Sequence, residues 1–191
     1  MVAIEPATGM LRHATNITHP RVYLTAGIGE AIPCKNATFQ AVWMSQVIHH
    51  LESLPMCATE LRRVLWPGGV VLLRGAFGAA GADIPIFRYF PGAFRVAQSF
   101  PSLMSIEDTF VGAGFEKTGH ELISQVIAPD LKALAKRLRL RADSTLQLIS
   151  DREFEEGIGR LERESASEIA TEPVREDIEL VVFTATRGCS P

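Results

Sequence analysis

The chain has 191 residues, which is long enough to bury a substantial hydrophobic core. Hydrophobic residues make up 47% and charged residues 21% of the sequence, a composition typical of a folded globular protein rather than a disordered one. The net charge of −3 argues against a protein that binds nucleic acid through a basic surface.

Membrane segments and disulfides are not expected either. No apolar run reaches the ~18 residues that a membrane-spanning helix needs, and the chain does not open with a secretory signal pattern. The cysteines Cys34, Cys57 and Cys189 are odd in number and far apart, which argues against a disulfide framework and a structural zinc site. We therefore expect a cytoplasmic protein that binds no membrane and no metal.

Short apolar runs alternate with helical patterns along the first half of the chain. Leu54, Ala58, Leu61 and Leu65 share one face of a helix expected over 54–65, which the sequence Pro67-Gly68-Gly69 ends. Apolar strands separated by helices favour an α/β fold with a mostly parallel sheet and helices on both faces. The expected strands are 2–4, 22–25, 41–45 and 70–73, and a further helix is expected over 7–14.

The second half continues this alternation after a segment without clear periodicity. Residues 77–101 are rich in Gly, Ala, Pro and Phe, and we expect a lid-like insertion over about 77–104 in an otherwise single domain spanning 1–191. Ser150 and Glu153 form a capping box for a helix to about residue 164. The other expected elements are a helix capped by Ser105 and ended by Gly112 and Gly114, a strand within 115–127, a helix over 130–140, a loop over 165–176 and a strand over 178–186.

An acidic residue, Glu5, follows the first strand directly. A carboxylate at the C-terminal tip of a parallel strand can accept hydrogen bonds from both hydroxyl groups of a nucleotide ribose. A carboxylate that simply precedes a helix N-terminus explains the same residue equally well.

The second strand is followed by the sequence Gly27-Ile28-Gly29-Glu30. It matches a phosphate-binding loop only weakly, because a third glycine is missing and Pro33 stands where the helix should continue. We expect instead a loop whose backbone approaches a flat ring, with Ile28 covering one ring face.

Two adjacent histidines, His49 and His50, follow the strand at 41–45. Because neighbouring side chains are expected to face different ways, they do not form a natural metal-binding pair. One packed and one solvent-facing histidine is the simplest interpretation, and a general base is the alternative.

In this order and spacing, the segments resemble the class I S-adenosylmethionine-dependent methyltransferases, in particular the small-molecule group with a methyltransferase-11/25-type core. The resemblance is dense from Met1 to about Arg74 and rests on the segments 2–11, 27–33, 39–51 and 60–74. It implies a Rossmann-like fold with an antiparallel last strand, S-adenosylmethionine as the cofactor and a small molecule as the methyl acceptor.

The resemblance also implies roles for individual residues. Glu5 and the adjacent Pro6 would contact the cofactor ribose, and Met10 would pack near the adenine. His50 and His49 lead as catalytic bases, ahead of His120 and Tyr89. The remaining implied contacts are Gly27, Ile28, Gly29 and Glu30 around the adenine, Ser45 and Gln46 beside the methionine end, and Arg88 and Tyr89 toward the substrate.

One part of the family pattern is not found in this sequence. The family's first strand and its Gly-rich loop are expected about 20–25 residues before Glu5. Without that strand, two buried strands lack a partner, at about 1–3 kcal/mol for each unpaired buried backbone group. Three explanations stay open: a shortened chain, pairing of the second strand with the fourth, or a strand from a partner chain, such as a second copy in a homodimer.

Two classes of function fit these observations. Retention of Glu5, Met10 and the segment 45–50 favours methyl transfer. The missing Gly-rich loop, Ile28, and Gln40 in place of an aspartate favour a non-catalytic methyltransferase-like binding or oligomerisation module. A dinucleotide-dependent oxidoreductase is disfavoured, because Pro67-Gly68-Gly69 is typical of methyltransferases.

Overall fold

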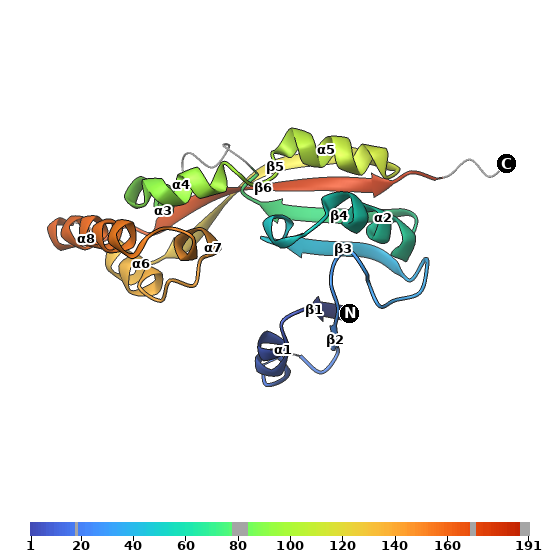
Figure 1. The fold of residues 1–191 in the computed structure, drawn as a ribbon, viewed down its shortest axis with the longest axis horizontal. Helices are drawn as coiled ribbons and strands as arrows, with labels where there is room; N and C mark the ends of the chain where they lie inside the picture. Colours follow the sequence, from blue (N-terminus) through green and yellow to red (C-terminus); the bar gives the residue numbers. More distant parts are fainter. Residues whose placement is uncertain (18, 78–83, 169–170, 188–191) are drawn as a thin grey trace. The chain divides into compact units, whose positions relative to one another are not determined.

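The computed structural model describes residues 1–17, 19–77, 84–168 and 171–187 (Figure 1). These residues form two compact units. Unit 1 comprises Met1–Leu73, Ile106–Gly119 and the C-terminal segment from Val181. Unit 2 comprises Arg74–Ser105 and His120–Leu180.

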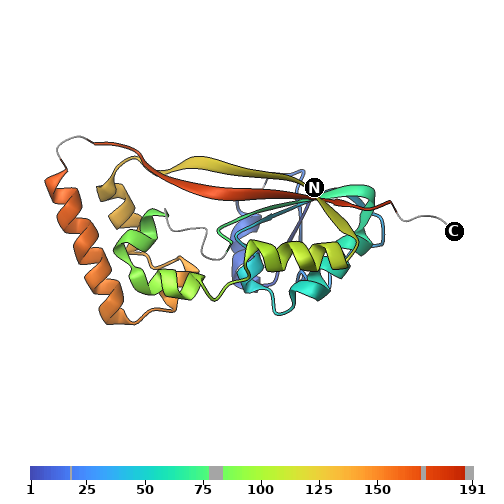
Figure 2. The ribbon, with the colours of Figure 1, turned by 90° about the horizontal axis from the view of Figure 1, so that it is seen from above.

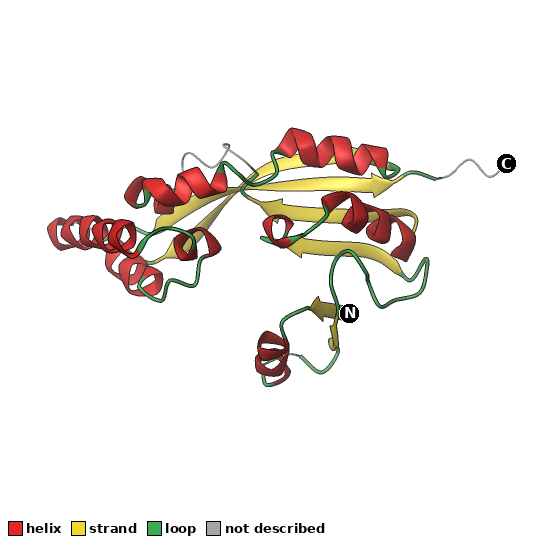
Figure 3. Ribbon diagram, in the orientation of Figure 1, coloured by secondary structure: helices red, strands yellow, loops and turns green. Residues whose placement is uncertain are grey.

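The described residues contain both helices and strands (Figure 3), and every described helix precedes β6, the last strand. The strands are β1 (Val2–Glu5), β2 (Tyr23–Ala26), β3 (Phe39–Ser45), β4 (Leu65–Gly75), β5 (Phe115–Ala128) and β6 (Val174–Ala185). The helices are α1 (Thr8–Thr15), the 3-10 helix η1 (Ile48–His50), α2 (Leu54–Val64), α3 (Pro85–Tyr89), α4 (Pro91–Ala97), α5 (Leu103–Gly112), α6 (Leu131–Leu138), α7 (Ser144–Gln147) and α8 (Asp151–Ser167).

The strands form two sheets. β1 and β2 are parallel, and their register places Glu5 opposite Ala26. The other sheet has the order β3-β4-β6-β5, and Figure 1 shows β3 and β4 pointing one way and β6 the other. The expected α/β fold with an antiparallel last strand is therefore confirmed. Within the described residues β1 and β3 belong to separate sheets, so the pairing of the second strand with the fourth is wrong.

The core of unit 1 lies where α2 and α5 bury their apolar faces. The buried residues of α2 are Cys57, Ala58, Leu61 and Val64. Of the predicted apolar face, Ala58 and Leu61 are confirmed, whereas Leu54 is half-buried and Leu65 lies in β4. Phe110 of α5 stacks on Phe183 of β6, with ring centroids 4.5 Å apart. The N-terminus of α2 lies beside the candidate site described below.

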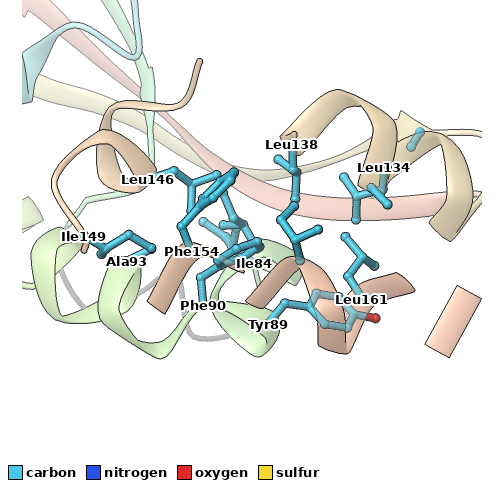
Figure 4. Packing of buried hydrophobic residues seen from close by; sticks show 14 residues of the cluster. Ile84, Tyr89, Phe90, Ala93, Leu134, Leu138, Leu146, Ile149, Phe154 and Leu161 are labelled. Atoms are coloured by element: carbon cyan, nitrogen blue, oxygen red, sulfur yellow. The ribbon is translucent and has the colours of Figure 1, made fainter. Parts of the chain in front are cut away.

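Unit 2 is built around a second apolar cluster (Figure 4). Its buried side chains come mainly from α3, α6, α7 and α8, and Phe90 stacks on Phe154 with ring centroids 5.9 Å apart. The strands β5 and β6 run side by side as long ribbons in both views (Figure 2). Because all buried residues of this cluster belong to unit 2, this unit has a hydrophobic core of its own.

Several element boundaries differ from the sequence expectations. Pro67, Gly68 and Gly69 lie inside β4 rather than before it, because α2 already ends at Val64. Residues 77–101 contain two short helices, α3 and α4, each beginning at a proline. The Oγ of Ser102, not Ser105, accepts a hydrogen bond from a backbone N–H at the start of α5. The capping box of α8 is confirmed, but the helix continues to Ser167, and β6 begins at Val174, so the expected loop over 165–176 is shorter.

Candidate functional site

The parallel pairing of β1 and β2 brings two of the expected site segments to one edge. Glu5 ends β1 and Ala26 ends β2, so Glu5 lies beside the start of the loop that contains Gly27. Ligands of open α/β sheets bind outside the carboxyl ends of the strands. The residues predicted to hold a ribose and to line a flat ring therefore share the edge at which a ligand is expected.

Glu5 is half-buried, and one of its two carboxylate oxygens accepts a hydrogen bond within the protein. Its Oε1 accepts a hydrogen bond from the backbone N–H of Ala7, 2.8 Å away, at the start of α1. This contact agrees with a carboxylate that precedes a helix N-terminus, and the bonded N–H belongs to Ala7, the residue before Thr8 of α1. Among the described residues no other hydrogen bond to the carboxylate of Glu5 is found. Pro6 and Met10 are exposed, Met10 to 61% of its surface.

Gly27 and Gly29 lie where the chain passes close to its own side chains. A Cβ at Gly27 would lie 2.8 Å from Cδ of Pro33, and one at Gly29 would lie 2.9 Å from Cδ2 of Leu51. Both glycines are therefore required by packing within unit 1. Ile28 is 46% exposed, so its side chain is accessible on this loop.

Glu30 has a different contact from the one predicted. Its Oε1 accepts hydrogen bonds from the backbone N–H groups of Glu52 at 2.8 Å and Ser53 at 3.2 Å. The carboxylate thus binds the N-terminal end of α2, where negative charge is favourable. The side chain of Glu30 thus ties the loop to this helix through Oε1.

The segment after β3 adjoins the same loop. Gln46 has a left-handed backbone with φ of 54°, which is uncommon for a residue other than glycine and often marks functional sites. It follows Ser45, the half-buried last residue of β3, and precedes η1, which contains both histidines. Leu51, directly after η1, lies against Gly29. The structure therefore brings Glu5, the loop 27–30 and the segment 45–51 into one region of unit 1.

The two histidine rings approach each other. Their centroids are 4.1 Å apart with an interplanar angle of 49°, so the expectation that they face different ways is wrong. His49 is half-buried and His50 is exposed, as the packed-and-exposed interpretation predicted.

A thiol lies beneath this region. Cys57 is buried on α2 and lies against Gly29. Burial, together with the carboxylates of Glu30 and Glu60, raises the pKa of Cys57 to about 12. Cys57 therefore stays a neutral thiol near pH 7 and is a packing residue rather than a nucleophile.

The predicted substrate residues lie in unit 2. Tyr89 is only 3% exposed within the unit 2 cluster, and this burial raises the pKa of Tyr89. Such burial argues against the predicted contact between Tyr89 and a substrate, since the ring packs as a core residue. Arg88 is 69% exposed at its side chain and pairs with Glu164 at 2.7 Å.

Sequence reasoning missed two polar clusters. In unit 1, Glu60 and Arg63 form an i,i+3 ion pair on α2 that also binds the loop after Ile32. In unit 2, the buried Glu179 accepts a hydrogen bond from Phe77 N–H at 3.2 Å and lies 3.1 Å from Nε2 of His120. The i,i+3 spacing of opposite charges signals the first pair, but no sequence signal joins residues as distant as 120 and 179.

The described part of the chain shows neither a metal-binding cluster nor a membrane-spanning helix. No group of three or more His, Cys, Asp or Glu residues is placed there to hold a metal ion. No helix there is long and apolar enough to cross a membrane.

Comparison with known proteins relates the N-terminal part of unit 1 to one family. Residues 1–73 match the family described as methyltransferase domain. A 72-residue segment is 38% identical to the malonyl-[acyl-carrier protein] O-methyltransferase of Erwinia pyrifoliae, and it represents 38% of this chain and 27% of that protein. The match thus spans about a quarter of the curated relative.

Solved structures share the fold over nearly the whole chain. A protein of Anabaena variabilis described as a methyltransferase of an antibiotic biosynthesis pathway has a TM-score of 0.67 and 20% identity, covering 96% of this chain and 81% of its own. The [4+2]-cyclase SpnF has a TM-score of 0.63 and 14% identity, and the match covers 98% of this chain and 66% of the SpnF chain. Because identities this low show the fold alone, the reaction has to be argued from the site.

Proposed function

We propose that this chain is a class I S-adenosylmethionine-dependent methyltransferase that transfers a methyl group to a small-molecule acceptor. The family match of residues 1–73 and the shared fold support this proposal. The observation that carries this proposal is the meeting of Glu5 and the loop 27–30 at the carboxyl edge of β1 and β2, inside the segment that matches the family.

The residues at this edge fit an adenosine group in part. Glu5 binds Ala7 through Oε1 and can offer its other oxygen to ribose hydroxyl groups. The exposed Ile28 offers apolar contact to a flat ring, whereas the space beside Gly27 and Gly29 is filled by the protein itself. Pro6, Met10, the backbone of Glu30, Ser45 and Gln46 complete the proposed cofactor contacts.

The chemistry of the cofactor is simple. S-adenosylmethionine carries a methyl group on a positively charged sulfur, from which an acceptor oxygen or nitrogen can take it. The protein then has to orient the acceptor, exclude water and accept a proton where the acceptor carries one. We propose His50 for this proton, with His49 beside it, because both follow β3 and directly precede Leu51, which lies against Gly29.

The finer parts of this proposal concern substrate and assembly. We propose Arg88 as a contact for an acidic acceptor, since its side chain is largely exposed despite its ion pair with Glu164. A lid role for the segment 77–104, a partner strand beside β1 and a cytoplasmic location stay predictions from the sequence.

Methyl transfer is tested by incubating the protein with S-adenosylmethionine that carries a labelled methyl group. The acceptors are small carboxylic acids, phenols and amines, and transferred label is counted. Protein-dependent transfer to one of them supports the proposal. Binding of S-adenosylhomocysteine without transfer to any acceptor would favour the non-catalytic module.

His50→Ala and His49→Ala separate the roles of the two rings. We expect His50→Ala to lower turnover more than it weakens binding of S-adenosylhomocysteine, because a proton acceptor acts in the reaction step. An equal loss of turnover and binding would assign His50 a structural role. His13→Ala, an exposed histidine on α1, serves as the control.

A further inference from the structure

The connection between β2 and β3, residues 27–38, is tied to α2 at several points. Glu30 binds the backbone N–H groups of Glu52 and Ser53, at the N-terminal end of that helix. Farther along the connection, Ile32 N–H donates a hydrogen bond of 2.8 Å to Oε2 of Glu60. Ordering a loop costs conformational entropy. Because these hydrogen bonds offset that cost, we expect the fixed conformation of this connection to serve a function.

Arg63 is the centre of these ties. Its Nε and Nη2 donate to the two carboxylate oxygens of Glu60, both at 2.7 Å. Its remaining N–H groups donate to three acceptors on the connection: Ile32 O at 2.9 Å, Cys34 O at 2.8 Å and Asn36 Oδ1 at 2.9 Å. A guanidinium has five N–H donors, and all five are used here.

The backbone of the same turn of α2 adds two further ties. Ala37 N–H donates to Arg63 O at 2.9 Å, and Thr38 N–H donates to Val64 O at 2.7 Å. Ala37 has a left-handed backbone with φ of 47°, a conformation that persists only where the surroundings fix it. Arg63 thus holds the connection through both its side chain and its main chain.

We propose that Glu60 and Arg63 are a positioning pair for the cofactor loop. The pair sets the path of residues 32–36, and this fixed path together with the packing of Gly29 on Cys57 keeps residues 27–30 ordered before a ligand arrives. A loop that is already ordered does not lose conformational freedom on binding, so affinity rises. This inference rests on the proposed function, since it takes residues 27–30 to face the adenosine group.

The test compares Arg63→Gln with Arg62→Gln. Arg62 is a matched control, because it lies on the same helix and its guanidinium donates to Thr186 O, away from the connection. Calorimetric titration with S-adenosylhomocysteine, at a temperature where both variants are folded, should give an affinity about tenfold weaker for Arg63→Gln than for Arg62→Gln. Equal affinities of the two variants would overturn the proposal.

Two further measurements separate positioning from general stability. Arg63→Lys keeps the positive charge but has a single ammonium group, so it should resemble Arg63→Gln in affinity rather than the wild type. Amide hydrogen exchange over residues 27–38 should be faster in Arg63→Gln and unchanged in Arg62→Gln. Unchanged exchange in Arg63→Gln would overturn the positioning role without any ligand.

Hydrogen exchange also separates this proposal from the proposed function. Absence of S-adenosylhomocysteine binding by the wild type would refute the proposed function and with it the cofactor role of the pair. Faster exchange in Arg63→Gln in that case would show that the pair orders the loop for another purpose.

Discussion

Glu5 is the single residue on which the proposed cofactor site depends most. Replacement by Gln keeps an oxygen that can accept the hydrogen bond from Ala7 and removes the negative charge. We expect Glu5→Gln to weaken S-adenosylhomocysteine binding by about 1–3 kcal/mol, the scale of a lost charge-assisted hydrogen bond. Calorimetry measures the change, and Glu52→Gln, an exposed carboxylate with the same charge change, is the control. Unchanged affinity in Glu5→Gln would remove Glu5 from the site.

A second prediction at the residue scale concerns the reactivity of Cys34 and Cys57. Because the pKa of Cys57 is raised to about 12, only about one molecule in ten thousand carries the thiolate at pH 8, and burial limits access as well. Iodoacetamide should therefore modify the half-buried Cys34 well before Cys57 in the folded protein. Peptide mapping by mass spectrometry follows both sites, and urea should bring their rates together. Rapid modification of Cys57 without urea would contradict the assigned environment.

The sequence was informative for single residues where the contact is local. Glu5 before a helix and Ser150 with Glu153 in a capping box follow from short-range patterns, and the structure bears both out. The burial of Tyr89 depends instead on α8, more than sixty residues away, and so could not be foreseen from the neighbouring aromatic residues. The contacts of Glu30 with the start of α2 were missed for the same reason.

At the scale of elements, substitutions of Gly157 and Gly159 test how α8 packs. A Cβ at Gly157 would lie 2.3 Å from the ring of Phe90 and 2.9 Å from Tyr89 O, whereas one at Gly159 would meet only Nη1 of Arg163 at 3.3 Å. Gly157→Ala should lower the free energy of unfolding by about 1–3 kcal/mol through overpacking. Gly159→Ala should raise it by up to about 1 kcal/mol, because alanine favours helix.

Urea unfolding of both glycine variants measures these changes. The two substitutions are chemically identical and lie two residues apart on one helix, so helix propensity cancels in the comparison. Equal effects on the free energy of unfolding would mean that Phe90 does not pack on α8 as described.

The tie between α2 and the connection 27–38 predicts a pH dependence. Hydrogen bonds from Arg63 lower the pKa of Glu60, so this carboxylate contributes stability above its unfolded pKa of about 4.3 and loses it as pH falls through the lowered folded pKa. Wild type should therefore lose more free energy of unfolding than Glu60→Gln between about pH 6 and pH 3. Urea unfolding at several pH values provides the measurement, and parallel curves would contradict the assignment.

Elements were predictable where periodicity is strong. The apolar face of α2 and the strands of unit 1 follow from it, within about two residues at most ends. The helices α3 and α4 are too short to show a period, so proline at their starts was the only available signal. The length of β5 and β6 was underestimated, because strands that extend into a second unit alternate polar and apolar residues irregularly.

At the level of the whole molecule, the described residues form two compact units. The single domain with a lid-like insertion over about 77–104 stays a prediction from the sequence. The composition gives no sign of the division, since neither a linker nor a change in charge marks it. Among the described residues, β1 and β2 form one sheet and β3, β4, β6 and β5 form another.

Binding of S-adenosylhomocysteine to the wild-type chain tests the central claim most directly. The ligand is titrated calorimetrically into the folded 191-residue protein, with S-adenosylmethionine in a second titration. We expect saturable binding at one site per chain, weakened by Glu5→Gln and by Arg63→Gln. A folded chain that binds neither compound would contradict it and would leave the methyltransferase fold as a scaffold for another purpose.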